Sequence, residues 1–232
     1  MTDWGKLSDE IFESYFKQTE IYVSRVLASG DNHMDCLLAY YQEAWKVPKR
    51  FKGNSAAMGF VPEFLIFETV KQHLKKKYKS KFNIKDRTKT SGGLTETAYF
   101  VDEPEARHLL VQGLRIGANE YGFPPTDCQH DVAYMVKDGI WKAKAIIEVK
   151  GYYESASLKG DIEKLENAEN KYSKTDDCAF AFVGFIRSSE VSRPAKAVIR
   201  PFVAKKNHYF ISPGEVNPEI GNSSLENLLE RL

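Results

Sequence analysis

The sequence lacks an apolar run that approaches the roughly 20 residues needed to cross a bilayer. Its N-terminal residues also lack the basic segment followed by an apolar one that marks a secretory signal. Cysteine is scarce: Cys36, Cys128 and Cys178 are odd in number and far apart, which argues against a disulfide framework and against a zinc site. We therefore expect a cytoplasmic protein with reduced thiols and no membrane contact.

Several catalytic motifs are missing as well. The histidines are scattered, no Gly-x-Ser-x-Gly sequence is present, and no glycine-rich phosphate-binding loop precedes an expected helix. A large positive charge is also missing, since the formal net charge is +1. This balance still allows a metal-dependent nuclease, which needs acidic residues at its centre and can keep its basic residues on one face. Lysine and arginine are clustered in residues 46–52 and 71–81.

The rest of the composition is that of an ordinary globular protein, with 42% hydrophobic and 28% charged residues among 232. This length suits one structural domain with an extension. Apolar residues recur at helical spacing over residues 8–30 and again over residues 31–45, before Pro48. We expect residues 1–55 to form a helical N-terminal extension packed on a core domain of residues 56–232.

Residues 131–150 carry the pattern on which the functional interpretation depends. Two apolar runs joined by an Asp-Gly pair at 138–139 predict a β-hairpin. Because alternate side chains of a strand share a face, Glu148 and Lys150 point to one side while their apolar neighbours point to the other. Asp131 opens the partner strand and can be folded back toward them. Two carboxylates beside a lysine could hold a divalent metal and poise a water for attack.

Asp131 and the segment from Glu148 to Lys150 resemble the PD-(D/E)XK nuclease superfamily, and are most like a type II restriction endonuclease. In this chain His130 stands where the family has proline. Asp127, in a proline-marked loop, is a rival for the first aspartate, although Asp131 directly opens the apolar run. The resemblance implies an α/β fold, with a central mixed β-sheet flanked by helices and an added N-terminal helical extension.

The same resemblance implies a magnesium site. Asp131 and Glu148 would bind Mg²⁺, with the carbonyl of Val149 as a further candidate ligand. Lys150 would orient or activate the attacking water and stabilise charge in the transition state. The product of cleavage would then carry a 5′-phosphate.

A helix expected over residues 59–78 adds one more candidate. Pro62 suits its first turn, and Glu63 lies close to its N-terminus, where a carboxylate is favoured electrostatically. Family resemblance makes Glu63 an auxiliary metal ligand, because the first helix of the superfamily carries a glutamate that reaches the site. Glu68 is expected to face elsewhere.

A parallel strand pair is expected after the hairpin. A helix over residues 158–172 followed by an apolar strand over residues 178–186 predicts a βαβ crossover. The remaining expectations are strands over residues 81–85, 95–101, 197–204 and 207–211, helices over residues 103–110 and 225–232, and a loop over residues 112–127 that crosses the mouth of the site.

Polar and basic residues near these elements are candidates for contacts with DNA. They are Lys159, Lys164, Arg187, Arg193, Arg115 and Asn119. With the site above, they favour a Mg²⁺-dependent, sequence-specific endonuclease that cuts double-stranded DNA as a homodimer. Two alternatives stay open: a structure-selective, repair or defence nuclease of the same fold, and a nucleic-acid-binding module without catalysis.

Overall fold

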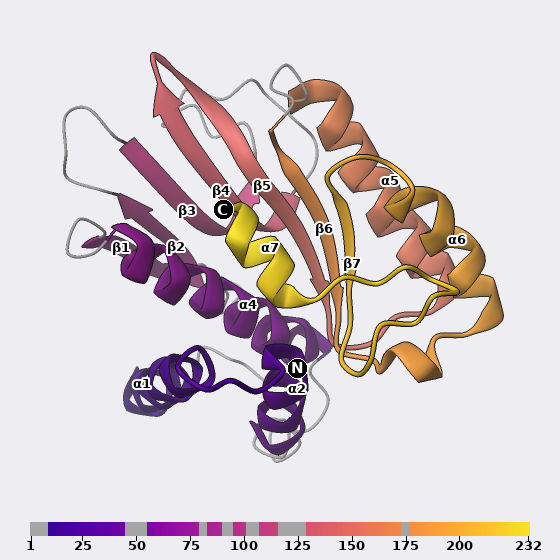
Figure 1. The fold of residues 1–232 in the computed structure, drawn as a ribbon. Coiled ribbons are helices and arrows are strands. Elements are labelled where there is room, and N and C mark those ends of the chain that lie inside the picture. The colour runs from indigo at the N-terminus through magenta and orange to yellow at the C-terminus, as the bar shows by residue number, and fades with distance from the viewer. Residues whose placement is uncertain are drawn as a thin grey trace.

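The computed structural model describes residues 9–44, 55–78, 83–89, 95–100, 107–115, 129–172 and 177–232. It confirms the expected fold class, a mixed β-sheet between helices (Figure 1). The helices are α1 (Asp9–Val26), α2 (His33–Ala44), α4 (Ser55–Tyr78), α5 (Ser155–Tyr172), the 3₁₀ turn η4 (Ser188–Glu190), α6 (Arg193–Val203) and α7 (Leu225–Arg231). The strands are β1 (Asn83–Lys89), β2 (Thr95–Phe100), β3 (Arg107–Arg115), β4 (Gln129–Asp138), β5 (Ile140–Lys150), β6 (Ala179–Gly184) and β7 (His208–Ile211).

The described strands form one seven-stranded sheet in the order β1 to β7. Neighbours from β1 to β5 run antiparallel, whereas β5, β6 and β7 run parallel. The β4–β5 hairpin turns at Gly139, whose φ of 67° lies in the left-handed region that glycine adopts readily. Parallel neighbours require a crossover, and α5 and α6 supply the two that are needed. Both the predicted hairpin and the predicted β5–α5–β6 crossover are therefore confirmed.

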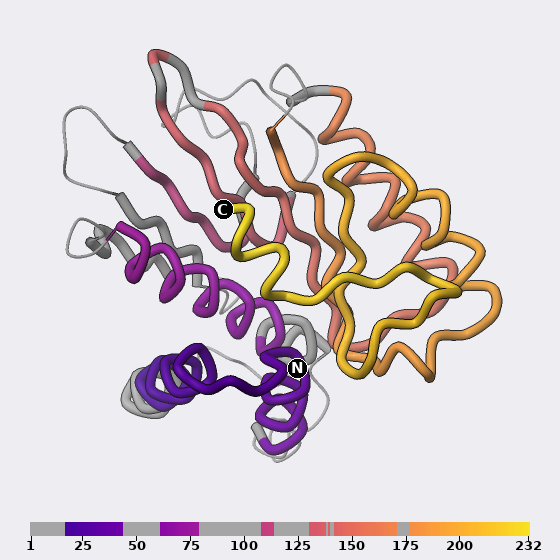
Figure 2. Tube along the Cα trace, in the orientation of Figure 1, coloured from indigo at the N-terminus to yellow at the C-terminus, as the bar shows by residue number. Residues whose placement is uncertain are grey.

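Hydrophobic cores fill the space on both sides of the sheet. One core contains side chains of α4 and α7 together with Ile147 and Val149 of β5. The other packs α5 and α6 against Ile146 of the same strand. Figures 1 and 2 show α4 and α7 on one side of the sheet and α5 and α6 on the other. Because side chains alternate along β5, Glu148 follows Ile146 toward the α5 side.

The first two helices pack against α4. Val23 of α1 and Leu37 of α2 are fully buried and belong to the same core as Phe64 of α4. Tyr22 and Tyr40 stack with ring centroids 4.4 Å apart, which joins α1 to α2. The N-terminal helices thus pack on α4, and α2 also contacts α7 through His33 and Glu226.

Four expectations about local structure differ from the structure. The expected helix over residues 103–110 is in part the strand β3, because Leu110 faces the α4 core while Leu109 and Val111 face the α5 core. A strand buried on both faces has consecutive apolar residues, which do not show an alternating pattern. Within the expected loop over residues 112–127, residues 112–115 continue β3, and residues 116–128 lie outside the described part of the chain.

The expected strand over residues 197–204 is the C-terminal part of α6. The Ser192 side chain caps this helix by accepting a hydrogen bond from the Ala195 N–H, and a proline follows in the first turn. Ala195, Ile199 and Phe202 are buried at spacings of four and three residues, which is the period of a helix.

Helix α4 also begins earlier than expected, at Ser55, so that Pro62 lies inside it rather than in its first turn.

Candidate active site

The residues of the predicted triad meet at the end of β5. Glu148 is fully buried, while the side chains of Asp131 and Lys150 are 15% and 28% exposed. Asp131 Oδ2 accepts a hydrogen bond of 2.7 Å from the Val149 N–H and lies 3.7 Å from Lys150 Nζ. The start of β4 is therefore tied to the end of β5, as the folded-back position of Asp131 required. The Val149 side chain itself is buried in the α4 core.

His130 contacts the carboxyl group of Glu148. Its Nδ1 lies 2.7 Å from Glu148 Oε1, and both side chains are buried. Sequence reasoning noted His130 as a replacement for the family's proline but missed this contact. This contact could have been predicted from the position of His130, which lies directly before Asp131 in a strand that pairs with β5.

Helix α5 contributes two further charged groups. Asp161 is buried, and its Oδ1 lies 3.2 Å from Lys164 Nζ and 3.8 Å from Lys150 Nζ. Lys164 Nζ is also 4.0 Å from Glu148 Oε2. Lys164, expected as a phosphate contact, therefore joins the carboxylates directly. From the sequence, Asp161 is considered with Lys159 and Lys164 as a possible phosphate contact but is not placed in the site, because its burial beside the strand residues is not visible in the sequence.

The charges of the same cluster act on Glu63 of α4. Its pKa is raised to about 8: burial and, after it, the charge of Asp131 raise the pKa, while Lys150 and Lys164 partly offset them. These are the charges of the β4, β5 and α5 groups just described. Glu63 lies two turns inside α4 rather than at its N-terminus, because the helix begins at Ser55. The expected stabilisation by the helix end is thus wrong, whereas the neighbourhood with Asp131 agrees with the expectation.

The pKa values of Glu148 and Asp131, the two carboxyl groups on the strands, are both raised. Burial raises the pKa of Glu148 well above its ordinary value, and the charge of Asp131 adds to the shift. Burial also raises the pKa of Asp131, against the effects of Lys150 and the Val149 N–H. For Lys150, burial lowers the pKa but the surrounding carboxylates, Asp131 foremost, raise it by more. The ammonium group of Lys150 is therefore kept charged by the cluster.

The donor set of this cluster fits a hard divalent cation. Four carboxyl groups face two ammonium groups, so that full ionisation leaves two uncompensated negative charges, the charge of one divalent ion. Glu148 Oε2 and Asp161 Oδ2 are buried without a hydrogen-bond partner. Oxygen ligands of this kind suit Mg²⁺, which needs only one or two carboxylates beside water and phosphate. Within the described ranges, no three His, Cys, Asp or Glu side chains are grouped closely enough to enclose an ion.

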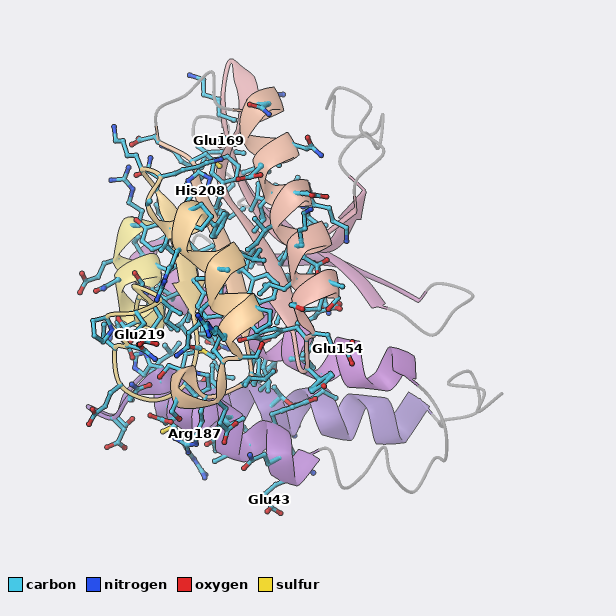
Figure 3. The ribbon with its side chains drawn as sticks, turned by 90° about the vertical axis from the view of Figure 1, so that its right-hand side faces the viewer. Glu43, Glu154, Glu169, Arg187, His208 and Glu219 are labelled. Carbon is cyan, nitrogen blue, oxygen red and sulfur yellow. The ribbon has the colours of Figure 1, made fainter. Side chains whose placement is uncertain are left out.

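The other predicted contacts lie away from the cluster or outside the described residues. Lys159 pairs with Glu163 on the exposed side of α5, with 3.8 Å between Nζ and Oε1. Arg187, labelled in Figure 3, pairs with Asp35 of α2 at 3.0 Å. The three remaining candidates are Arg193, which is exposed at the start of α6, Arg115, which ends β3, and Asn119, which lies outside the described residues together with the rival Asp127.

Comparison of the chain with protein-family models, with curated proteins and with solved structures finds no significant match. A functional assignment therefore depends on the chemistry of the cluster. A search of the described helices finds none that combines the length and the apolar character needed to cross a membrane.

Proposed function

We propose that this protein is a Mg²⁺-dependent endonuclease that hydrolyses phosphodiester bonds of double-stranded DNA, in the manner of a type II restriction enzyme. The observation that carries the proposal is the convergence of Asp131, Glu148 and Lys150 at the end of β5. An α4 carboxyl group, that of Glu63, faces the same cluster. The order of elements from α4 through the β3–β4–β5 meander and α5 to β6 is the arrangement that the family resemblance implies.

Asp131 and Glu148 would hold the metal ion, with Glu63 as an auxiliary ligand and the Val149 carbonyl as a further one. Bound there, Mg²⁺ would promote ionisation of a water and neutralise charge on the phosphate oxygens. The hydrogen bond from the Val149 N–H fixes one oxygen of Asp131, and His130 fixes one oxygen of Glu148. Each carboxylate thus keeps its second oxygen for a ligand.

Lys150 would orient the attacking water and stabilise the negative charge that develops on the phosphorus oxygens. Its ammonium group is 3.7 Å from Asp131 Oδ2, so the water it orients would also lie beside a carboxylate that can accept a proton. Attack on phosphorus breaks the bond to the 3′ oxygen and leaves a 5′-phosphate. Lys164, 42% exposed in its side chain, is placed to contact a phosphate of the same strand.

Double-strand cleavage needs one site for each strand. A homodimer would supply two, related by the same symmetry as a palindromic DNA site. We therefore propose a homodimer as the active form, with the oligomeric state measured by light scattering in the presence and absence of DNA.

The test is incubation of the purified chain with long mixed-sequence DNA and Mg²⁺, with EDTA as the metal-free arm. Discrete fragments are the expected product. The substitutions Asp131→Asn, Glu148→Gln and Lys150→Met should each abolish cleavage while circular dichroism stays unchanged. Glu163→Gln on the exposed side of α5 is the matched control and should cut like the wild type.

Other outcomes separate the alternatives. Cleavage confined to branched DNA would favour a structure-selective or repair nuclease with the same residues. Binding of DNA without any cleavage would contradict the nuclease proposal and favour a non-catalytic nucleic-acid-binding module.

A further inference from the structure

The ammonium group of Lys150 lies between two carboxylates from different elements. Its Nζ is 3.7 Å from Asp131 Oδ2 on β4 and 3.8 Å from Asp161 Oδ1 on α5. Both distances are longer than a hydrogen bond between nitrogen and oxygen. A lysine stem is flexible, so the place of this ammonium group depends on which of the two carboxylates attracts it more strongly.

Asp161 is a costly residue at its position in α5. Its side chain is 7% exposed, and its neighbours Ile162 and Leu165 belong to the core beneath the helix. Its Oδ1 lies 3.2 Å from Lys164 Nζ, whereas its Oδ2 is buried without a hydrogen-bond partner. A buried carboxylate oxygen without a donor is unfavourable, so an apolar side chain would serve the stability of α5 as well. This position retains a negative charge, and that charge faces the ammonium groups of Lys150 and Lys164.

Four described carboxyl groups act electrostatically on Lys150, those of Asp131, Asp161, Glu148 and Glu63. Three of them, all except Asp161, are the ligands of the proposed magnesium site. A bound divalent cation compensates the negative charge of its ligands, so their attraction for the ammonium group falls. Asp161 is then the carboxylate that remains to hold Lys150 beside the reacting phosphate.

We propose that Asp161 is the positioning residue for Lys150, and that it holds the ammonium group on the α5 side of the site while the other three carboxyl groups serve the cation. The proposal rests on the proposed function and deepens it, because it assigns to the reaction a residue that binds neither the metal nor DNA. A single oxygen, Oδ1, faces Lys150 and Lys164 together. It therefore also sets the distance between the ammonium group that orients the water and the one placed to contact a phosphate.

Pairing with Lys164 alone would give Asp161 an ordinary structural role. Lys164 follows it by three residues, at the spacing of a common helical ion pair, and its side chain is 42% exposed. Such a pair stabilises α5 locally, and Lys150 does not depend on it. The two roles thus differ in whether Asp161 acts on Lys150 or on Lys164 only.

The first experiment measures this dependence without catalysis, by urea unfolding of the full chain in EDTA and in Mg²⁺. The variants are Asp161→Asn, Lys150→Met and the double variant. If the two residues are coupled, the urea midpoint of the double variant falls by less than the sum of the two single falls. This difference should persist in Mg²⁺, where the other three carboxyl groups are engaged. The same cycle with Lys164→Met in place of Lys150→Met measures the helical ion pair separately.

The second experiment measures cleavage of long mixed-sequence DNA in Mg²⁺. Asp161→Asn should lower kcat on the order of ten- to a hundred-fold, because it releases the ammonium group from its working position. The KM for DNA and the Mg²⁺ concentration for half-maximal rate should stay at their wild-type values. Asp161→Glu keeps the charge but moves it by one methylene, and should retain an intermediate kcat. Glu163→Gln, on the exposed side of α5, should match the wild type.

Wild-type kcat in Asp161→Asn, or a raised KM with kcat unchanged, would overturn the positioning role and leave the nuclease proposal intact. Additive falls in the cycle of Asp161 and Lys150 in Mg²⁺ would overturn it as well. If Asp161→Asn does not fold, Asp161→Glu decides, since wild-type kcat in that variant would contradict the role. Conversely, coupling of Asp161 to Lys150 in a protein that never cuts DNA would support the positioning role and contradict the nuclease function.

Discussion

The imidazole of His130 and the carboxyl group of Glu148 form a buried pair, with 2.7 Å between Nδ1 and Oε1. This contact joins β4 to β5 at the point where the backbone pairing of the two strands ends at Val132 and Ile147. It directs Oε1 of Glu148 away from the neighbouring Lys164. The position of Oε2, the Glu148 oxygen proposed to bind the metal, thus depends on the contact that His130 makes with Oε1.

Removing this imidazole should destabilise the protein and, under the proposed function, also slow DNA cleavage. His130→Ala leaves Glu148 Oε1 buried without a donor, which costs about 1 to 3 kcal/mol of unfolding free energy. Urea denaturation monitored by circular dichroism measures the loss. His130→Asn is the control, since its amide can reach the place of Nδ1 and donate. Equal stability of the alanine and asparagine variants would show that the hydrogen bond contributes nothing.

Gly184 is expected to tolerate no side chain. A Cβ atom there would lie 2.5 Å from Cε1 of Tyr153, whose ring packs edge-on against Phe182. Gly184→Ala should therefore lower the free energy of unfolding by about 1 to 3 kcal/mol, as overpacking commonly does.

A control for this substitution exists on α5. Gly160 has nothing within 4 Å of its built Cβ, so Gly160→Ala should stabilise the helix by about 0.5 to 1 kcal/mol. Thermal unfolding of both variants checks the opposite signs. A stable Gly184→Ala protein would mean that Tyr153 is free to move aside.

His108 should make stability depend on pH on the acidic side of neutrality. Burial lowers the pKa of His108 below its usual value near 6.5, and the charge of Lys77 adds to the effect. The unfolded chain therefore takes up the proton more readily than the folded one. This contribution to stability is complete above pH 6.5 and declines as pH falls through the lowered pKa.

The measurement is urea unfolding at pH 7.5 and pH 5.5. His108→Gln, whose amide can still pair with the Tyr134 hydroxyl that lies 2.6 Å from Nδ1, should lose less stability between these pH values than the wild type. Parallel pH curves for the two proteins would contradict the assignment.

A buried ion pair joins two turns of α4. Lys71 is fully buried, and its Nζ contacts Glu68 and lies 2.7 Å from Glu20 of α1. Lys71→Met should cost about 3 to 5 kcal/mol, because it leaves the buried Glu68 without its cation. Adding Glu68→Leu should recover most of this loss in denaturation experiments. Additive losses in the double variant would argue against the pair. Glu68 thus engages Lys71 and Gln72 of its own helix, as expected for a side chain that does not serve the site.

Local signals in the sequence were sufficient for the hairpin and for the strand half of the site. The Asp-Gly turn and the alternation around Glu148 and Lys150 are properties of neighbouring residues, and the structure confirms what they predict. Asp161 could not be selected in the same way. Its burial depends on how α5 is rotated against the sheet, and that rotation is set by packing between elements distant in sequence.

The secondary structure of two segments, β3 and α6, was predicted wrongly for a related reason. In β3 the consecutive apolar residues Leu109 to Val111 face two different cores, which a one-sided pattern cannot represent. In α6 the apolar residues Val198, Ile199, Phe202 and Val203 match a strand as well as a helix when read alone. The cap at Ser192 and the buried Ala195 decide the matter, and both lie outside the span of residues 197–204 that was expected to be a strand.

Because pairing changes from antiparallel to parallel at β5, the start of β4 and the C-terminal ends of β5 and β6 lie at the same end of the sheet. The chain leaves β5 and β6 at the end of the sheet where β4 begins, so the segments after Lys150 and after Gly184 both border the carboxylates. Insertions or substitutions in these two connections would change what surrounds the site without shifting the strand register that fixes Glu148 and Lys150. Under the proposed function, specificity for a DNA sequence could therefore change in these connections while the residues proposed for hydrolysis stay in place.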